Sequence, residues 1–183
     1  VGGEREGARG RFRPKAGSDW TFLNPDSSTN PDVVAMADQI PFPDGSFQNV
    51  KLTEVLEHLE TPESALRECG RVLAPGGKLV VSVPFLVPVH GDPHDFRRWT
   101  PSGLKQLLER AGFSRVEIRP MGGCVAVVLD LFEYYCHHQV SARGKLRWWV
   151  RVIRIFLRRV LPGFLLWLDG RLVARTEITT GYF

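Results

Sequence analysis

The sequence contains few cysteines, and those present are not spaced for a disulfide or a metal. Its 183 residues include three cysteines, Cys69, Cys124 and Cys136, and none of them forms a CxxC pair. This odd number and wide spacing argue against a disulfide framework and against a zinc ribbon, and they fit a reducing, cytoplasmic compartment. Hydrophobic residues make up 43% of the chain and charged residues 24%, which is ordinary for a globular domain with one core.

Positive charge is scarce in most of the chain and concentrated near its end. Residues 139–183 contain 9 Lys and Arg against 2 Asp and Glu, whereas residues 1–138 contain 15 against 18. We therefore expect any attraction to an anionic partner to come from the C-terminal quarter.

The basic C-terminal quarter is predicted to contain an amphipathic helical insertion, residues 139–171, placed before the last strand. Its five arginines between positions 147 and 159 argue against a membrane-spanning segment. Residues 145–161, with arginines on one helical stripe and Trp, Ile and Phe elsewhere, have two interpretations: peripheral contact with a membrane surface, or packing on the domain itself or on a second subunit. Nucleic-acid binding is not expected, because the aromatic residues suit burial better than stacking on bases.

Short apolar segments alternate with segments of helical spacing. The predicted strands are residues 20–24, 33–37, 49–56, 78–85, 114–120 and 175–183. Such alternation favours an α/β fold, in which a mostly parallel sheet is covered on both faces and ligands bind at the carboxyl ends of the strands. We expect one domain over residues 1–183, and the glycines that directly follow Val1 indicate an N-terminally truncated first strand.

Two helices are predicted from their end signals. Over residues 61–73 and 100–113, Thr61 and Thr100 are expected to be N-caps, each followed by proline at the first helical position. Gly112 fits the position just after the second helix, where a left-handed backbone is common.

Three stretches in this order carry a family resemblance: "IPFPDGSF" (40–47), "LTEVLEHLETPESALRECGRVLAPGGKLVVSVPF" (52–85) and "HGDPHDFRRWTPSGLKQLLERAGF" (90–113). Residues 31–119 resemble a class I S-adenosylmethionine-dependent methyltransferase of type 11. The resemblance implies a three-layer, Rossmann-like sheet with an antiparallel last strand and S-adenosylmethionine as cofactor. It further implies methyl transfer to a small-molecule or lipid-linked cell-surface precursor, in the cytoplasm or at the inner face of its membrane.

The resemblance also implies which residues bind the cofactor. The glycine turn after the first strand corresponds to Gly2 and Gly3, and Glu54 would line the pocket near the end of the fourth strand. The ribose hydroxyls would be bound by Asp26, with Asn24 as the alternative register, and the adenine by Asp38.

Three positions depart from the family pattern. Glu4 replaces a glycine, Met36 stands where the adenine-reading aspartate usually falls, and Gln48 replaces the aspartate that follows "SF". These departures favour an alternative function, a catalytically impaired methyltransferase-like binding module that could be recruited to a membrane.

Residues 89–99 form a polar segment directly after an apolar strand. No fixed spacing of the HExxH kind is present, so no dedicated metal site is expected. Two interpretations remain: a self-bonded loop in which Asp95 pairs with Arg97 or Arg98, or an acceptor-site loop in which His90 or His94 is the general base. Glu57 and His58 are expected mainly to fix the loop after the fourth strand.

Overall fold

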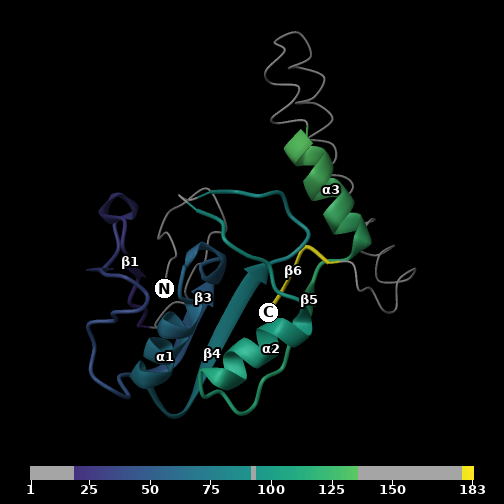
Figure 1. The fold of residues 1–183 in the computed structure, drawn as a ribbon. Coiled ribbons are helices and arrows are strands. Elements are labelled where there is room, and N and C mark those ends of the chain that lie inside the picture. Colours follow the sequence, from purple (N-terminus) through teal and green to yellow (C-terminus); the bar gives the residue numbers. More distant parts are fainter. Residues whose placement is uncertain (1–18, 92–93, 136–178) are drawn as a thin grey trace. The chain divides into compact units, whose positions relative to one another are not determined.

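The computed structural model describes residues 19–91, 94–135 and 179–183 (Figure 1). The chain divides into two compact units. The first comprises residues 1–83, 91–118 and 183, and the second comprises residues 84–90 and 119–182. The predicted glycine turn at Gly2 and Gly3 and the predicted basic helix within 139–171 lie outside the described residues.

Parallel strand pairs form the sheet elements of the first unit. Strand β1 (Leu23–Asn24) pairs with β2 (Val33–Val34), and β3 (Phe47–Thr53) pairs with β4 (Leu73–Pro84). Val50 lies opposite Leu79, and Leu52 lies opposite Val81. The prediction of an α/β fold with mostly parallel strands is confirmed, although β1 and β2 are each shorter than the predicted strands.

Helices α1 (Pro62–Val72) and α2 (Pro101–Arg110) contact each other in the first unit. The Thr100 hydroxyl accepts a hydrogen bond from the Gly103 amide at 3.2 Å, and Gly112 has a φ of +102°, so the predicted caps of α2 are confirmed. The predicted N-cap of α1 at Thr61 is confirmed as well. Its φ of −122° and ψ of 71° differ from the extended geometry of Thr100, and its side chain forms no capping hydrogen bond within the described residues.

The core of the first unit is built from residues that alternate on the strands and recur at helical spacing on the helices. The fully buried apolar side chains are Leu52, Leu56, Ala65, Leu66, Cys69, Val83 and, at 1% exposure each, Val72 and Leu104. Burial raises the pKa of the Cys69 thiol to about 11, so this cysteine behaves as an apolar core residue and not as a nucleophile.

The structure corrects the predicted start of the longest strand. This strand was predicted to begin at residue 78, but β4 already begins at Leu73 and passes through residues 74–77. Gly76 has a φ of +77°, and a Cβ atom on Gly77 would lie 2.9 Å from the Ala74 carbonyl oxygen and 3.0 Å from that of Gln48. Only glycine permits the backbones to approach so closely, so the Pro-Gly-Gly sequence shapes the strand instead of preceding it.

The second unit contains the antiparallel pair. Strand β5 (Pro120–Met121) pairs antiparallel with β6 (Gly181–Tyr182), as expected for the last strand. The predicted strand at 114–120 is wrong for residues 114–119: apolar alternation there is not sufficient, because β6 pairs with Pro120 alone among the residues of this segment. The predicted strand at 175–183 is likewise confirmed only at Gly181–Tyr182 within the described residues.

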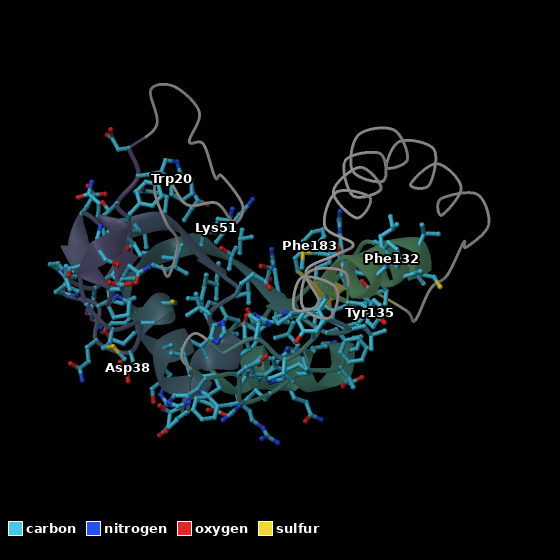
Figure 2. All side chains as sticks on the ribbon, turned by 90° about the horizontal axis from the view of Figure 1, so that it is seen from above. Trp20, Asp38, Lys51, Phe132, Tyr135 and Phe183 are labelled. Carbon is cyan, nitrogen blue, oxygen red and sulfur yellow. The ribbon has the colours of Figure 1, made fainter. Side chains whose placement is uncertain are left out.

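Helix α3 (Cys124–Tyr135) of the second unit has no counterpart among the predicted elements. Its sequence is apolar and rich in valine, so it lacks the polar face by which an amphipathic helix is identified. Phe132 and Tyr135, labelled in Figure 2, are exposed on it. None of the helices in the described part of the chain combines the length and the apolar content that a bilayer crossing requires.

Arg71, near the end of α1, fixes the connection between β2 and β3. Its guanidinium forms a two-pronged ion pair with Glu68, at 2.7 and 2.8 Å, and a further ion pair with Asp44 at 2.8 Å. It also donates to the carbonyl oxygens of Ile40 and Phe42, both at 2.8 Å. The Glu68 carboxylate in turn accepts from the Ile40 amide at 3.0 Å, so the segment 40–44 is held on α1 at several points.

We predict that Arg71→Ala lowers the free energy of unfolding by about 2–3 kcal/mol, because it leaves two carbonyl oxygens and two carboxylates without this donor. The matched control is Arg67→Ala, since Arg67 is exposed on the same helix and its guanidinium donates to the Ser64 hydroxyl at 3.2 Å. The control should change stability by less than about 0.5 kcal/mol. Urea denaturation measures both, and equal losses would contradict a special role of Arg71.

Candidate functional site

The end of β1 carries the two residues predicted to bind ribose. Asn24 is the last residue of the strand, and its side-chain oxygen accepts from the Asp26 amide at 2.9 Å. Asp26 is the N-cap of the short 3-10 helix η1 (Ser27–Thr29), and its carboxylate accepts from the Ser28 amide at 2.8 Å. Hydrogen bonds from Ser28 lower the pKa of Asp26, so its exposed carboxylate is ionised at neutral pH.

The residues predicted to face the adenine follow β2. Asp38 is half-buried in a turn that precedes the Arg71-bound segment, and its side chain is labelled in Figure 2. Met36, two residues earlier, is 49% exposed, and its carbonyl oxygen accepts from the Gln39 amide at 3.2 Å. An exposed apolar side chain therefore stands beside the acidic one.

The end of β3 has an unusual backbone conformation. Glu54 has a φ of +52°, a left-handed conformation that costs a non-glycine residue roughly 1–2 kcal/mol. Its amide donates to the Ser82 carbonyl at 3.0 Å, and its carboxylate accepts from the Ser82 hydroxyl at 2.7 Å. These two contacts hold the Glu54 carboxylate at the carboxyl ends of β3 and β4. Ser82 is not among the predicted site residues, although its hydroxyl within the apolar run 79–85 is a usable signal.

A second acidic residue, Glu57, lies three positions later in the 3-10 helix η2 (Leu56–His58) and is fully buried. Burial raises its pKa from 4.5 to about 7, and the nearby Glu54 carboxylate adds to this, while His58 and Arg98 act in the opposite direction. The Glu57 carboxyl group therefore changes protonation near neutral pH. The His58 Nε2 atom lies 3.6 Å from the Oε1 atom of Glu57.

The segment 94–97 is tied to residues 57–60. The three hydrogen bonds that join them run from the Phe96 amide to the Glu57 carbonyl at 2.8 Å, from His58 Nδ1 to the His94 carbonyl at 2.5 Å, and from the Arg97 guanidinium to the Glu60 carbonyl at 2.9 Å. Every acceptor is a main-chain oxygen, so these contacts fix the path of the backbone in both segments. The polar loop after β4 is thus anchored beside the end of β3.

The structure decides between the two partners predicted for Asp95. Arg98 forms the ion pair, with one of its two hydrogen bonds at 2.7 Å, whereas Arg97 donates to the Glu60 carbonyl. The Asp95 side chain is only 1% exposed. The self-bonded interpretation of the loop is therefore correct for Asp95 and Arg98.

The two histidines predicted as general bases lie in different units. His94 is exposed in the first unit, and its ring centroid lies 5.4 Å from that of Phe96. His90 is half-buried in the second unit, where its Nδ1 atom lies 3.2 Å from the Pro88 carbonyl oxygen. The neighbouring Asp92 and Pro93 lie outside the described residues. The role of either histidine stays a prediction.

We predict that Glu57→Gln stabilises the protein above neutral pH. Because the pKa of Glu57 is raised on folding, the wild-type loses stability as pH rises from about 4.5 through about 7, by up to roughly 3 kcal/mol. A neutral amide removes this loss, so the variant should gain on the order of 1–3 kcal/mol at pH 8 and nothing at pH 4.

Urea denaturation at pH 4, 6 and 8 measures this difference. The matched control is Glu60→Gln, since Glu60 is exposed three residues later. A wild-type stability that does not decline between pH 5 and 8 relative to Glu57→Gln would contradict the assignment.

Sequence comparison identifies relatives of this region. Residues 21–81 match the profile of a family described as a methyltransferase domain. The chain is 34% identical over 103 residues to a 27-O-demethylrifamycin SV methyltransferase of Amycolatopsis mediterranei, a match that covers 56% of this chain and 31% of that protein. It is 32% identical to the ubiquinone/menaquinone biosynthesis C-methyltransferase UbiE of Proteus mirabilis, over 56% of this chain and 53% of that one. The chain thus spans about a third to a half of the length of these relatives.

Among solved structures, a SAM-dependent methyltransferase from Archaeoglobus fulgidus has the same fold. The TM-score is 0.51 at 17% identity, and the match covers 87% of this chain and 72% of that one. This likeness concerns the fold alone and confirms the Rossmann-like architecture. The family profile and the two curated relatives agree: residues 21–81 of this chain are similar to a methyltransferase domain.

Proposed function

We propose that the protein binds S-adenosylmethionine and transfers its methyl group to a small-molecule acceptor. One observation supports this more than any other: the Glu54 carboxylate is held by Ser82 in a strained conformation at the carboxyl ends of β3 and β4. In open α/β sheets this edge is where ligands bind. Strain of this kind persists where the surrounding structure enforces it, and it clusters at binding sites.

The side chains after the strands suit the chemistry of this cofactor. Asp26, ionised and exposed after β1, offers a carboxylate oxygen to the ribose hydroxyls. The exposed thioether of Met36 offers an apolar surface to the adenine ring, and the nearby Asp38 offers a hydrogen-bond acceptor to its amino group. Glu54 offers a second carboxylate to the cationic part of the ligand. Gly2 and Gly3 are included in the proposed cofactor site on the basis of the sequence resemblance alone.

When bound, S-adenosylmethionine supplies a sulfonium-activated methyl group that an acceptor oxygen, nitrogen or carbon attacks in line. The sulfur keeps the electron pair of the broken bond, and the proton of the acceptor passes to a base. We assign the task of base to His94 or His90, because a neutral imidazole nitrogen can accept a proton. The rest of the protein's contribution is to orient the two reactants, which supplies up to roughly 7–11 kcal/mol.

The class of acceptor is inferred from the relatives. One is named for a rifamycin and the other for ubiquinone and menaquinone biosynthesis, so both names refer to small molecules. A lipid-linked precursor belongs to the same proposal, because peripheral membrane contact through residues 145–161 would bring the site to such a molecule. That contact and the cytoplasmic location stay predictions.

We predict that Asp26→Ala weakens binding of adenosylhomocysteine by roughly tenfold or more, through loss of charged hydrogen bonds. Calorimetric titration measures this affinity. The matched control is Asp19→Ala, an exposed aspartate that precedes β1, and it should leave the affinity unchanged. If Asp26→Ala binds as well as wild-type while Asn24→Ala does not, the ribose contact belongs to Asn24.

We predict that one of the two variants His90→Ala and His94→Ala lowers turnover by about 100-fold or more while the affinity for adenosylhomocysteine stays the same. Transfer of a tritiated methyl group from S-adenosylmethionine to a panel of hydroxylated quinone precursors provides the assay. Equal losses of turnover and cofactor affinity would instead indicate that the histidine stabilises the loop.

The alternative function is a methyltransferase-like binding module without turnover. The apolar Met36 in place of an aspartate favours it, because the adenine then has one carboxylate fewer to contact. The two functions are separated by the same measurements. Cofactor binding with methyl transfer would support the enzyme. Cofactor binding without transfer to any acceptor in the panel, or absence of cofactor binding, would overturn methyl transfer and favour the binding module.

A further inference from the structure

We infer that His58 is a positioning residue that couples the cofactor edge at Glu54 to the loop 94–98. This inference rests on the proposed function, because it assigns the loop to the acceptor side of the same site. Its basis is the hydrogen bond between His58 and the main chain of His94, together with the short, buried connection from Glu54 to His58.

The bond between the two segments defines the state of the His58 ring. Nδ1 lies 2.5 Å from the His94 carbonyl oxygen, and because a carbonyl can only accept, Nδ1 carries the proton. On the opposite side of the ring, Nε2 lies 3.6 Å from the buried Glu57 carboxyl. The imidazole therefore spans from the acidic residue to the loop backbone, and its orientation sets where the His94 main chain lies.

The connection from Glu54 to His58 is short and well packed. Val55 is 9% exposed, and Leu56 and Glu57 are completely buried, so the chain between the two residues has little freedom to adjust. Glu54 itself is fixed through Ser82 on the neighbouring strand β4. Glu57 lies three residues after Glu54, and the next residue, His58, holds the loop. A shift of the Glu54 backbone on ligand binding would therefore be passed to His94 through well-packed residues.

The side-chain bond can be removed without touching the main-chain bonds. The Glu57 carbonyl accepts from the Phe96 amide at 2.8 Å whatever side chain occupies position 58. The loop also keeps its Asp95–Arg98 ion pair, which lies within the loop and not across to η2. Substitution of His58 therefore tests the coupling while the remaining anchors of the loop are preserved.

Two conservative substitutions separate the Nδ1 donor from the rest of the ring. His58→Asn keeps an N–H group near the Nδ1 position, whereas His58→Gln moves the amide toward the Nε2 position. Hydrogen–deuterium exchange of the peptide covering residues 94–99 reports the order of the loop, and calorimetric titration with adenosylhomocysteine reports binding. The α2 peptide, 101–110, is the internal control, and thermal unfolding confirms that each variant is folded.

In the wild-type we expect adenosylhomocysteine to slow exchange of residues 94–99 by threefold or more. His58→Gln should exchange about tenfold faster in this peptide, as expected for loss of one hydrogen bond of average strength, and should lose the response to the ligand. The affinity of His58→Gln for adenosylhomocysteine should fall by about the same factor by which this ligand slows exchange of residues 94–99 in the wild-type, because coupling between two sites is reciprocal. His58→Asn should restore both the slow exchange and the response.

Several results would overturn the inference. Wild-type exchange in His58→Gln, or a ligand response equal to that of wild-type, would show that the His58 bond does not position the loop. Failure of His58→Asn to restore protection would remove the role of the Nδ1 donor. If adenosylhomocysteine does not bind the wild-type at all, calorimetry shows this before any variant is compared, and the proposed function fails together with the coupling.

Discussion

The guanidinium of Arg71 is the contact on which the first unit most depends. It joins Glu68 of its own helix to Asp44 and to two carbonyl oxygens of the segment that leads from β2 to β3. A planar group with five donors satisfies four acceptor groups at once, which a lysine cannot do. This arrangement fixes where β3 begins relative to α1, and β3 in turn carries Glu54, Glu57 and the anchor of the polar loop. The hydrogen bonds to Arg71 lower the pKa of Glu68, so this contribution to stability is present above the ordinary pKa of a glutamate and is lost as pH falls.

Glu54 and Glu57 show how the same residue type acquires opposite properties within one turn of chain. Glu54 is exposed, and its carboxylate accepts a hydrogen bond from the Ser82 hydroxyl, so it is both fixed and open to a ligand. Glu57 is buried, and burial favours its neutral form up to about pH 7. Glu54 has a left-handed backbone at the end of β3, and three residues later Glu57 is completely buried. The site is therefore shaped by one local strain and by the packing that maintains it.

The segment 94–98 combines two roles that were alternatives in the interpretation of the sequence: a self-bonded loop and a loop that offers a histidine to the acceptor. Asp95 and Arg98 stabilise the loop, whereas His94 leaves its ring in solvent and uses its main chain to accept the bond from His58. A loop anchored through its backbone keeps its side chains available, as binding loops on rigid scaffolds generally do. This division of tasks is what makes His94 suitable for chemistry within the proposed function.

The sequence by itself determined the elements whose signals are local. The caps of α2 at Thr100 and Gly112 and the parallel α/β class follow from patterns within single segments of the chain. The resemblance to methyltransferases follows from the order of three such segments. Tertiary structure alone decided the contacts between residues far apart in sequence: Glu54 with Ser82, His58 with His94, and the burial of Glu57. These contacts depend on the strand register and on the path of the chain after each strand, which are settled by the packing of several segments together and not by the residues of one segment. The same reason explains the two wrong predictions, the strand at 114–119 and the start of β4 at residue 78. In both segments the backbone conformation depends on the partner strand beside it and not on the pattern of the segment itself.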